Sequence, residues 1–218
     1  MLSVELLRVS RRLVELGLNR GTSGSCSALL SDDASGHEAR FLITPSGVGV
    51  ETMFQDSMVE MTMDGEVCQP EKPYQPSSEW RFHRDIYRTR PEIGAVVHVH
   101  SPYATALSCL RRELPPFHYM IAVSGGENIR CAPYALFGTQ ALSDAVLEAL
   151  QGRTACLLAN HGMIATGRGL KHALALALEV ESLCEHYQHA AQLGEPVLLN
   201  ADEMAAAIER FKGYGQHG

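Results

Sequence analysis

Several features are scarce or missing in this sequence, and each absence excludes a class of protein. No run of apolar residues is long enough to cross a bilayer, and charged residues interrupt the apolar ones throughout residues 1–17. We therefore expect neither a membrane span nor a signal peptide. Basic residues are the minority, with 18 Lys and Arg against 25 Asp and Glu. The net charge of −7 argues against binding to nucleic acid or to an anionic membrane.

The cysteines form no recognisable motif. Six of them are scattered along the chain with no CxxC pair and no short spacing. This pattern suits neither a thiolate zinc site nor a disulfide framework, although the even count leaves disulfides open. It favours a protein of the reducing cytoplasm.

Length and apolar periodicity predict the architecture. The 218 residues, 45% apolar and 20% charged, suit one globular domain that spans residues 1–218. Helical spacing predicts helices at 2–16, 77–90, 101–110, 139–152, 169–193 and 201–212. Strands are expected within 39–50, at 95–100, within 127–135 and on both sides of a tight turn in 154–167. We expect a loop of small residues at 21–36 and irregular chain at 64–76. The fold class predicted is therefore α/β, with a central mixed β-sheet flanked by helices.

The stretch AVVHVHSPY, residues 95–103, carries two histidines in an otherwise apolar strand. Side chains alternate along a strand, so Val96, His98 and His100 share one face. Two imidazoles at one point need polar partners, which a bound metal ion supplies. A pair of half-exposed histidines bonded to water explains the strand equally well.

A third histidine and a carboxylate extend the metal hypothesis. His161 lies in the turn after an apolar strand, where a side chain can project into a cleft. Three histidines with one open position are typical of a catalytic metal site. Glu79 is expected in the first turn of a helix and is the candidate base. Taken singly, a histidine in such a turn and a glutamate at a helix start are more often simply exposed.

Small residues near Glu79 indicate a site for an anion. Ser77 and Ser78 offer hydroxyl groups and free backbone N–H groups at a helix start. The GTSGS stretch at 21–25 and the TPSG turn at 44–47 can also bring N–H groups close to a phosphate. Each stretch alone is more often an ordinary turn.

Eight short motifs give the chain a family resemblance. In order they are GTSGS, LITPSG, PSSEWRFH, AVVHVH, HYMIA, CAPYALFGT, NHG and FKGYG. Their order and spacing resemble those of the class II aldolase/adducin family, over nearly the whole chain. Within that family the motifs are most similar to those of the aldolases that act on L-fuculose 1-phosphate.

The resemblance implies an enzyme, a metal-dependent aldehyde-lyase of carbohydrate metabolism. Its cofactor would be one Zn²⁺ per subunit, or another divalent metal such as Mn²⁺ or Co²⁺. The implied ligands are His98, His100, His161 and Glu79. Glu79 would also be the base, Tyr119 the proton donor in a neighbouring subunit's site, and Tyr214 a second catalytic tyrosine. The family further implies a homotetramer with its sites at subunit interfaces.

The resemblance also implies how a sugar phosphate is held. The matching positions for phosphate or substrate are Thr22, Gly24, Ser25, Ser46, Gly47, Ser77 and Ser78. Phe137 and Phe211 match positions that line the aldehyde end of the substrate, with Thr22 beside them. Ser25 departs from the family pattern, which usually has asparagine there, and this departure bears on the substrate more than on the reaction.

The expected reaction is reversible cleavage of a ketose 1-phosphate to dihydroxyacetone phosphate and an aldehyde. L-Fuculose 1-phosphate, which gives L-lactaldehyde, is the first candidate substrate. The alternatives are 5-deoxyribulose 1-phosphate and 5-methylthioribulose 1-phosphate. Other family activities remain open: an epimerase acting on a pentulose phosphate, a methylthioribulose-phosphate dehydratase and a non-catalytic adducin-like scaffold.

Overall fold

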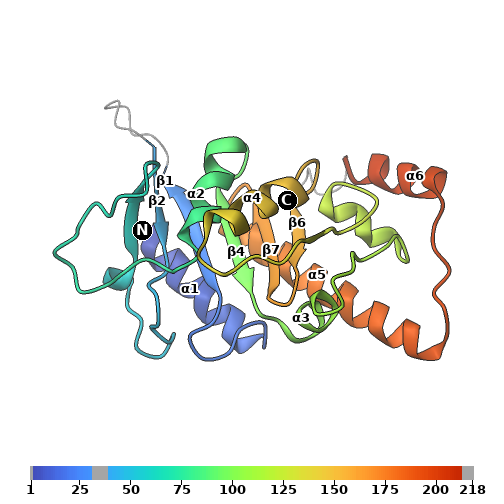
Figure 1. Cartoon of the computed structure of the whole chain (residues 1–218), viewed down its shortest axis with the longest axis horizontal. Coiled ribbons are helices and arrows are strands. Elements are labelled where there is room, and N and C mark those ends of the chain that lie inside the picture. The colour runs from blue at the N-terminus through green and yellow to red at the C-terminus, as the bar shows by residue number, and fades with distance from the viewer. Residues whose placement is uncertain (1, 31–38, 213–218) are drawn as a thin grey trace.

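A single seven-stranded sheet organises the chain. The computed structural model describes residues 2–30 and 39–212, and Figure 1 shows the sheet with helices on both of its faces. Along the sheet the strand order is β3-β2-β1-β4-β7-β6-β5. The strands are β1 Ser25–Leu30, β2 Arg40–Ile43, β3 Val59–Thr62, β4 Ala95–Val99, β5 Cys131–Ala132, β6 Ala155–Leu158 and β7 Gly162–Gly167.

The sheet is mixed, as predicted. Only β5 and β6 pair in parallel, and the other neighbouring strands are antiparallel. Strand β4 occupies the middle of the sheet, and all five of its residues are buried. His98 on β4 has Ser25 on β1 and Ile164 on β7 as its cross-strand partners. The histidine strand therefore lies at the centre of the sheet.

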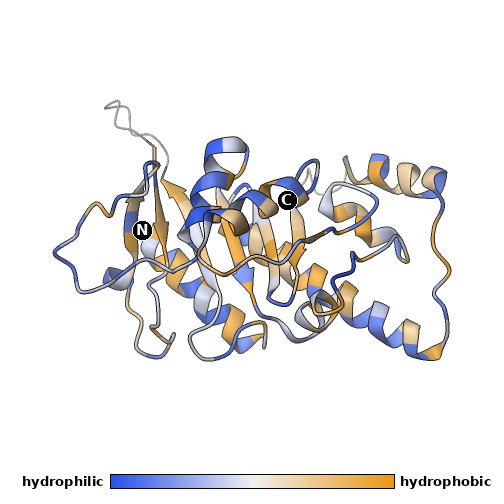
Figure 2. Cartoon of the chain, in the orientation of Figure 1, coloured by the Kyte–Doolittle hydropathy of each residue, from blue (hydrophilic) through white to orange (hydrophobic). Residues whose placement is uncertain are grey.

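Two apolar layers enclose the sheet. Helices α1 (Leu2–Glu15), α3 (Pro102–Ser108) and α5 (Leu170–Leu193) pack on one face, where Val97 and Val99 of β4 join their core. Helices α2 (Trp80–Thr89) and α4 (Gln140–Ala149) pack on the other face, together with Val96. Figure 2 shows the apolar residues concentrated on the strands between these layers. The alternation of β4 thus turns His98 toward the α2 side of the sheet.

The last part of the described chain extends away from the sheet. A short 3₁₀-helix, η2 (Tyr119–Ser124), packs against α6 (Ala201–Lys212). Helix α6 lies at one end of the long axis of the molecule and is reached by an extended segment after α5 (Figure 1). A second 3₁₀-helix, η1 (Gln55–Ser57), precedes β3. No helix in the described ranges has both the length and the apolar character needed to span a membrane.

The structure corrects two sequence predictions and adds one strand. Residues 25–30, predicted as part of a loop, form β1, because β2 and β4 pair with them from both sides. Strand β3 was not predicted. Helix α2 begins at Trp80 with Glu79 as its N-cap residue, so Glu79 precedes the first turn. Ser77 accepts a hydrogen bond from the Glu79 N–H in the turn before the helix and is not the N-cap.

Candidate active site

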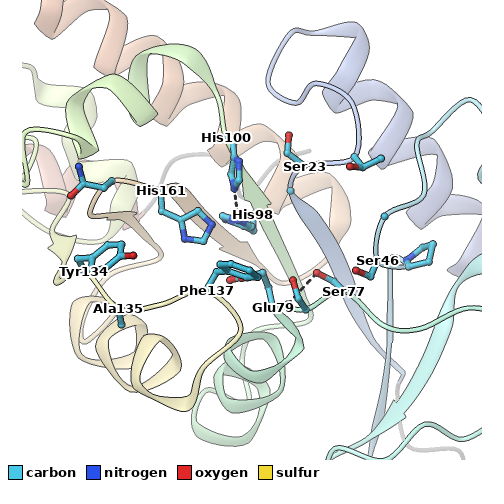
Figure 3. A pocket seen from close by; sticks show the side chains of 16 residues that line it. Ser23, Ser46, Ser77, Glu79, His98, His100, Tyr134, Ala135, Phe137 and His161 are labelled. Atoms are coloured by element: carbon cyan, nitrogen blue, oxygen red, sulfur yellow. Dashed lines mark hydrogen bonds between the residues drawn. The ribbon is translucent and has the colours of Figure 1, made fainter.

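Three histidines meet above the middle of the sheet. His98 comes from β4, His100 follows directly after β4, and His161 lies in the turn between β6 and β7. Because β4 and β7 pair, this turn lies beside the end of β4. Figure 3 shows the three rings pointing toward one another. Ring centroids are 4.8–4.9 Å apart in all three pairs.

Hydrogen bonds fix which ring nitrogens face the centre. Nδ1 of His98 lies 3.0 Å from the Met163 carbonyl oxygen, which can only accept, so Nδ1 carries the proton. Its Nε2 therefore presents a lone pair, 3.1 Å from Nε2 of His100. Oδ1 of Asn19 accepts a hydrogen bond from the His100 backbone N–H and holds the chain just after β4.

The three imidazoles are chemically suited to a divalent metal. Burial lowers the pKa of each ring, and that of His161 falls to about 4, so the rings are neutral at pH 7. Their ligand atoms all lie within 4.8 Å of one another. Neutral imidazole is a common zinc ligand, and the bond from His98 to Met163 is the outer contact that orients such a ligand. The donor set therefore fits a zinc-like ion.

Glu79 borders the same cavity with one oxygen engaged and one free. Oε1 accepts a hydrogen bond from the Gly138 N–H at 3.0 Å, whereas the buried Oε2 has no partner among the described residues. Burial raises the pKa of the Glu79 carboxyl to about 7, against the lowering effect of the Gly138 bond. A carboxylate with a pKa near 7 is suited to accept and return a proton at neutral pH.

A cavity of about 330 Å³ joins the histidines and Glu79 to small-residue loops. The predicted residues that line it are Thr22, Gly24, Ser46, Gly47, Ser77, Ser78, Glu79, His98, His100, Phe137 and His161. In Figure 3 the serines lie on one side of the three histidines and Tyr134 lies on the other. The cavity thus has a polar end and an aromatic end.

The polar end offers fewer free N–H groups than predicted. The Ser46 N–H donates to Gln75 and the Ser77 N–H donates to Thr44, so neither is free for an anion. The hydroxyls of Ser46 and Ser78 and the Gly47 N–H have no partner in the described ranges. These groups are among the donors available to a phosphate.

Several predicted site residues lie elsewhere. Ser25 does not line the cavity; it is buried and its hydroxyl bonds His83. Tyr119 is 55% exposed and stacks on Phe211, with ring centroids 6.3 Å apart, and neither residue lines the cavity of its own chain. Tyr214 lies outside the described residues.

Some residues that line the cavity were not predicted from the sequence. They are Ser23, Pro45, Tyr134, Ala135 and Asn160. All five lie inside the motifs quoted above, and membership of these motifs was the available signal. Asn160 has a φ of 55°, a left-handed conformation that asparagine tolerates in turns.

The comparisons with known proteins agree with this geometry. Residues 4–188 match the family described as class II aldolase and adducin N-terminal domain. The chain belongs to this family. The prediction of a class II aldolase fold is thereby confirmed, and so is that of an enzyme, an aldehyde-lyase.

Individual relatives cover almost the whole chain. A 5-methylthioribulose-1-phosphate/5-deoxyribulose-1-phosphate aldolase of Rhodospirillum rubrum is 49% identical over 97% of this chain and 91% of its own. The L-fuculose phosphate aldolase of Escherichia coli K12 is 42% identical, with coverage of 98% and 95%. A solved L-fuculose 1-phosphate aldolase superposes with a TM-score of 0.88 at 40% identity, covering 97% of this chain and 96% of that one.

Proposed function

We propose that the protein reversibly cleaves a ketose 1-phosphate into dihydroxyacetone phosphate and an aldehyde. The observation that carries this proposal is the unpartnered Oε2 of Glu79 at the wall of a cavity shared with three neutral histidines. Removal of a proton beside a carbonyl requires a base and a metal ion that polarises the carbonyl, and this cavity contains a carboxylate and three potential metal ligands.

The metal proposed is Zn²⁺, held by His98, His100 and His161, with Glu79 as a further ligand in the resting enzyme. Mn²⁺ and Co²⁺ are the alternatives. When bound, such an ion supplies Lewis-acid polarisation of the substrate carbonyl. No other group of three or more possible ligand residues is found in the described ranges.

The chain's own residues divide the remaining work. Ser46, Gly47 and Ser78, with Ser77 beside them, seat the substrate phosphate and so orient the reacting carbon. Oε2 of Glu79 removes the proton next to the carbonyl, because burial has raised the carboxyl pKa into the neutral range. Phe137, 62% exposed at the cavity rim, contributes an apolar wall at the aldehyde end.

We propose that Tyr119 and Phe211 act at the site of a neighbouring subunit in a homotetramer. They form an exposed stacked pair on η2 and α6, outside their own chain's cavity. Tyr119 would donate a proton to the aldehyde oxygen during condensation and accept it back in cleavage. Tyr214 is proposed as a second catalytic tyrosine from the sequence alone. Six free cysteines support the proposed cytoplasmic location.

Two substrate types are proposed for this cavity. L-Fuculose 1-phosphate is the first, and the 42% identical E. coli aldolase supports it. 5-Deoxyribulose 1-phosphate and 5-methylthioribulose 1-phosphate are the second, and the 49% identical R. rubrum aldolase favours them. All three carry an apolar terminus, which suits Phe137 and Ala135 at the cavity wall.

The deciding experiment is proton exchange of dihydroxyacetone phosphate in D2O, followed by NMR with the protein zinc-loaded and then chelated. We expect exchange that needs the metal and no aldehyde, and a panel of the three ketose phosphates then ranks the substrates. A zinc-containing protein that exchanges nothing would point to a pentulose-phosphate epimerase or a methylthioribulose-phosphate dehydratase. A protein that holds no stoichiometric metal would point to an adducin-like scaffold.

A further inference from the structure

A hydrogen-bonded series of buried polar side chains crosses the interface between β1 and α2. Nε2 of His83 lies 2.8 Å from Oγ of Ser25, and Nδ1 lies 2.7 Å from Oγ of Ser27. Oγ of Ser27 is in turn 2.6 Å from the hydroxyl of Tyr87. His83 and Ser27 are fully buried, and Ser25 and Tyr87 nearly so. The mechanism above uses none of these contacts.

Regular geometry produces this arrangement. Ser25 and Ser27 are two residues apart on β1 and therefore face the same side. His83 and Tyr87 are four residues apart on α2 and therefore share one helix face. Burial lowers the pKa of His83 to about 3, so the ring is neutral and carries one donor and one acceptor nitrogen. One serine hydroxyl donates to the ring and the other accepts from it.

Packing alone does not account for these residues. Their surroundings are apolar, with Phe82, Ile86 and Val96 in the same core cluster. A buried hydrogen bond contributes little net stability, whereas leaving one partner unpaired is costly. Apolar side chains of similar volume would fill the space at least as well. The hydrogen bonds, in addition, fix the position of β1 relative to α2.

The elements joined here are the two polar walls of the active-site cavity. Ser25 directly follows Thr22, Ser23 and Gly24, which line the cavity. His83 lies one helical turn after Glu79, the N-cap residue of α2. The bond between Ser25 and His83 therefore sets the distance between the 22–24 loop and the start of the helix that follows Glu79.

We propose that His83 is a positioning residue that acts through Ser25. It fixes the 22–24 loop relative to Ser77, Ser78 and Glu79, and so determines how tightly the phosphate-bearing end of the substrate is held. On the other side of the ring, Ser27 bonds Nδ1 and Tyr87 bonds Ser27, away from the cavity loop. This inference rests on the proposed function, because it assumes that the cavity binds a phosphate.

Two serines on the same ring provide a matched test. Ser25→Ala and Ser27→Ala each remove one buried hydroxyl and one hydrogen bond to His83, but only Ser25 adjoins the cavity loop. We expect Ser25→Ala to raise the Kd of inorganic phosphate and the KM of the ketose phosphate about five- to tenfold, with kcat within about twofold. Ser27→Ala should leave both constants within about twofold and lower only the melting temperature.

Two amide replacements of His83 separate its nitrogens. The Asn amide reaches the place of Nδ1 and keeps the contact to Ser27, whereas the Gln amide reaches the place of Nε2 and keeps the contact to Ser25. His83→Asn should reproduce the effect of Ser25→Ala, and His83→Gln should stay close to wild type in Kd and KM. The double variant Ser25→Ala/His83→Asn should be no worse than either single variant.

The outcomes separate this inference from the proposed function. If the wild-type protein binds no phosphate and exchanges no dihydroxyacetone phosphate, both fail. If the wild type does both but Ser25→Ala and Ser27→Ala behave alike, only the positioning role of His83 is overturned. Additive effects in the double variant would also overturn it, because Ser25 would then act on the substrate directly.

Discussion

Gly138 holds one oxygen of Glu79 and leaves the other free. The Gly138 N–H donates to Oε1 at 3.0 Å, and Oε2 is buried without a partner in the described ranges. A carboxylate oriented in this way has one anchoring oxygen and one reactive oxygen. This hydrogen bond links the start of α2 to the loop that carries Phe137. It therefore connects the proposed base to the proposed wall of the aldehyde site.

Glu79→Gln should abolish proton exchange while it preserves the site. The Gln carbonyl oxygen can still accept from Gly138, but the amide cannot remove a proton. We expect the variant to retain most of its zinc, measured by elemental analysis, and to exchange dihydroxyacetone phosphate at least about 100-fold more slowly. An exchange rate equal to that of the wild type in D2O would remove Glu79 from its role.

The metal-free protein should lose stability as the pH rises through the Glu79 pKa. Burial raises this pKa from its ordinary 4.5 to about 7. Between these values the unfolded chain releases the proton that the folded chain keeps, so the contribution is full below pH 4.5 and lost through pH 7. The loss amounts to at most about 3 kcal/mol. The variant Glu79→Gln should not show this pH-dependent loss of stability.

Histidines oppose this trend in the same pH range. Burial lowers the pKa of His161 to about 4, so its contribution is present above about pH 6.5 and lost as the pH falls through 4. Subtracting the unfolding free energy of Glu79→Gln from that of the wild type at each pH cancels the histidine contribution. Urea titrations of the chelated proteins from pH 5 to 8 give the difference. A flat difference would show that Glu79 is not buried as described.

Much of the site follows from local sequence pattern. Strand alternation alone predicts that His98 and His100 share a face, and the structure confirms that their rings meet. The apolar spacing of 169–193 predicts α5 to within one residue. Both patterns depend only on residues that are close together in the sequence, so they can be recognised without knowledge of the fold.

The placement of Ser25 could not be read in that way. SCSALL contains no β-branched or aromatic residue, and it forms a strand because β2 and β4 flank it. The partner of Ser25, His83, is 58 positions away, and only the packing of α2 on the sheet brings them together. The resemblance placed Ser25 at the substrate, whereas its hydroxyl points into the core.

Mixing two inactive variants should restore cleavage if sites are shared between subunits. Tyr119→Phe chains keep Glu79, and Glu79→Gln chains keep Tyr119. In a randomly mixed ring about one quarter of the sites would then combine both intact residues. Co-refolding the variants one to one should give cleavage near that fraction of wild type. Tyr119→Phe alone should still exchange dihydroxyacetone phosphate, because Glu79 is untouched.

Recovery must come from mixed oligomers rather than from residual activity. Each variant refolded alone provides the control and should cleave the ketose phosphate at well below one tenth of the mixed rate. If the mixture cleaves no faster than the average of the separate variants, Tyr119 does not complete a neighbour's site. The exposed stack with Phe211 would then need another explanation.

Gly138→Ala should harm catalysis more than its stability cost explains. Gly138 has a φ of 71°, and an added Cβ would lie 3.0 Å from the Ser78 carbonyl oxygen. The left-handed backbone costs an alanine about 1 kcal/mol. The contact with Ser78 adds to this cost and shifts the N–H away from Oε1 of Glu79. Gly138 cannot simply move outward, because Arg81 donates a 2.6 Å hydrogen bond to its carbonyl oxygen.

Gly152→Ala separates the two effects. Gly152 has a similar φ of 65° but open space around the added Cβ, so the substitution carries only the backbone cost. Both variants should lose about 1 kcal/mol of unfolding free energy or more, measured by urea titration. Only Gly138→Ala should also slow proton exchange, by about tenfold, because only Gly138 orients the base. Equal exchange rates in the two variants would show that Glu79 keeps its reactive geometry without the Gly138 hydrogen bond.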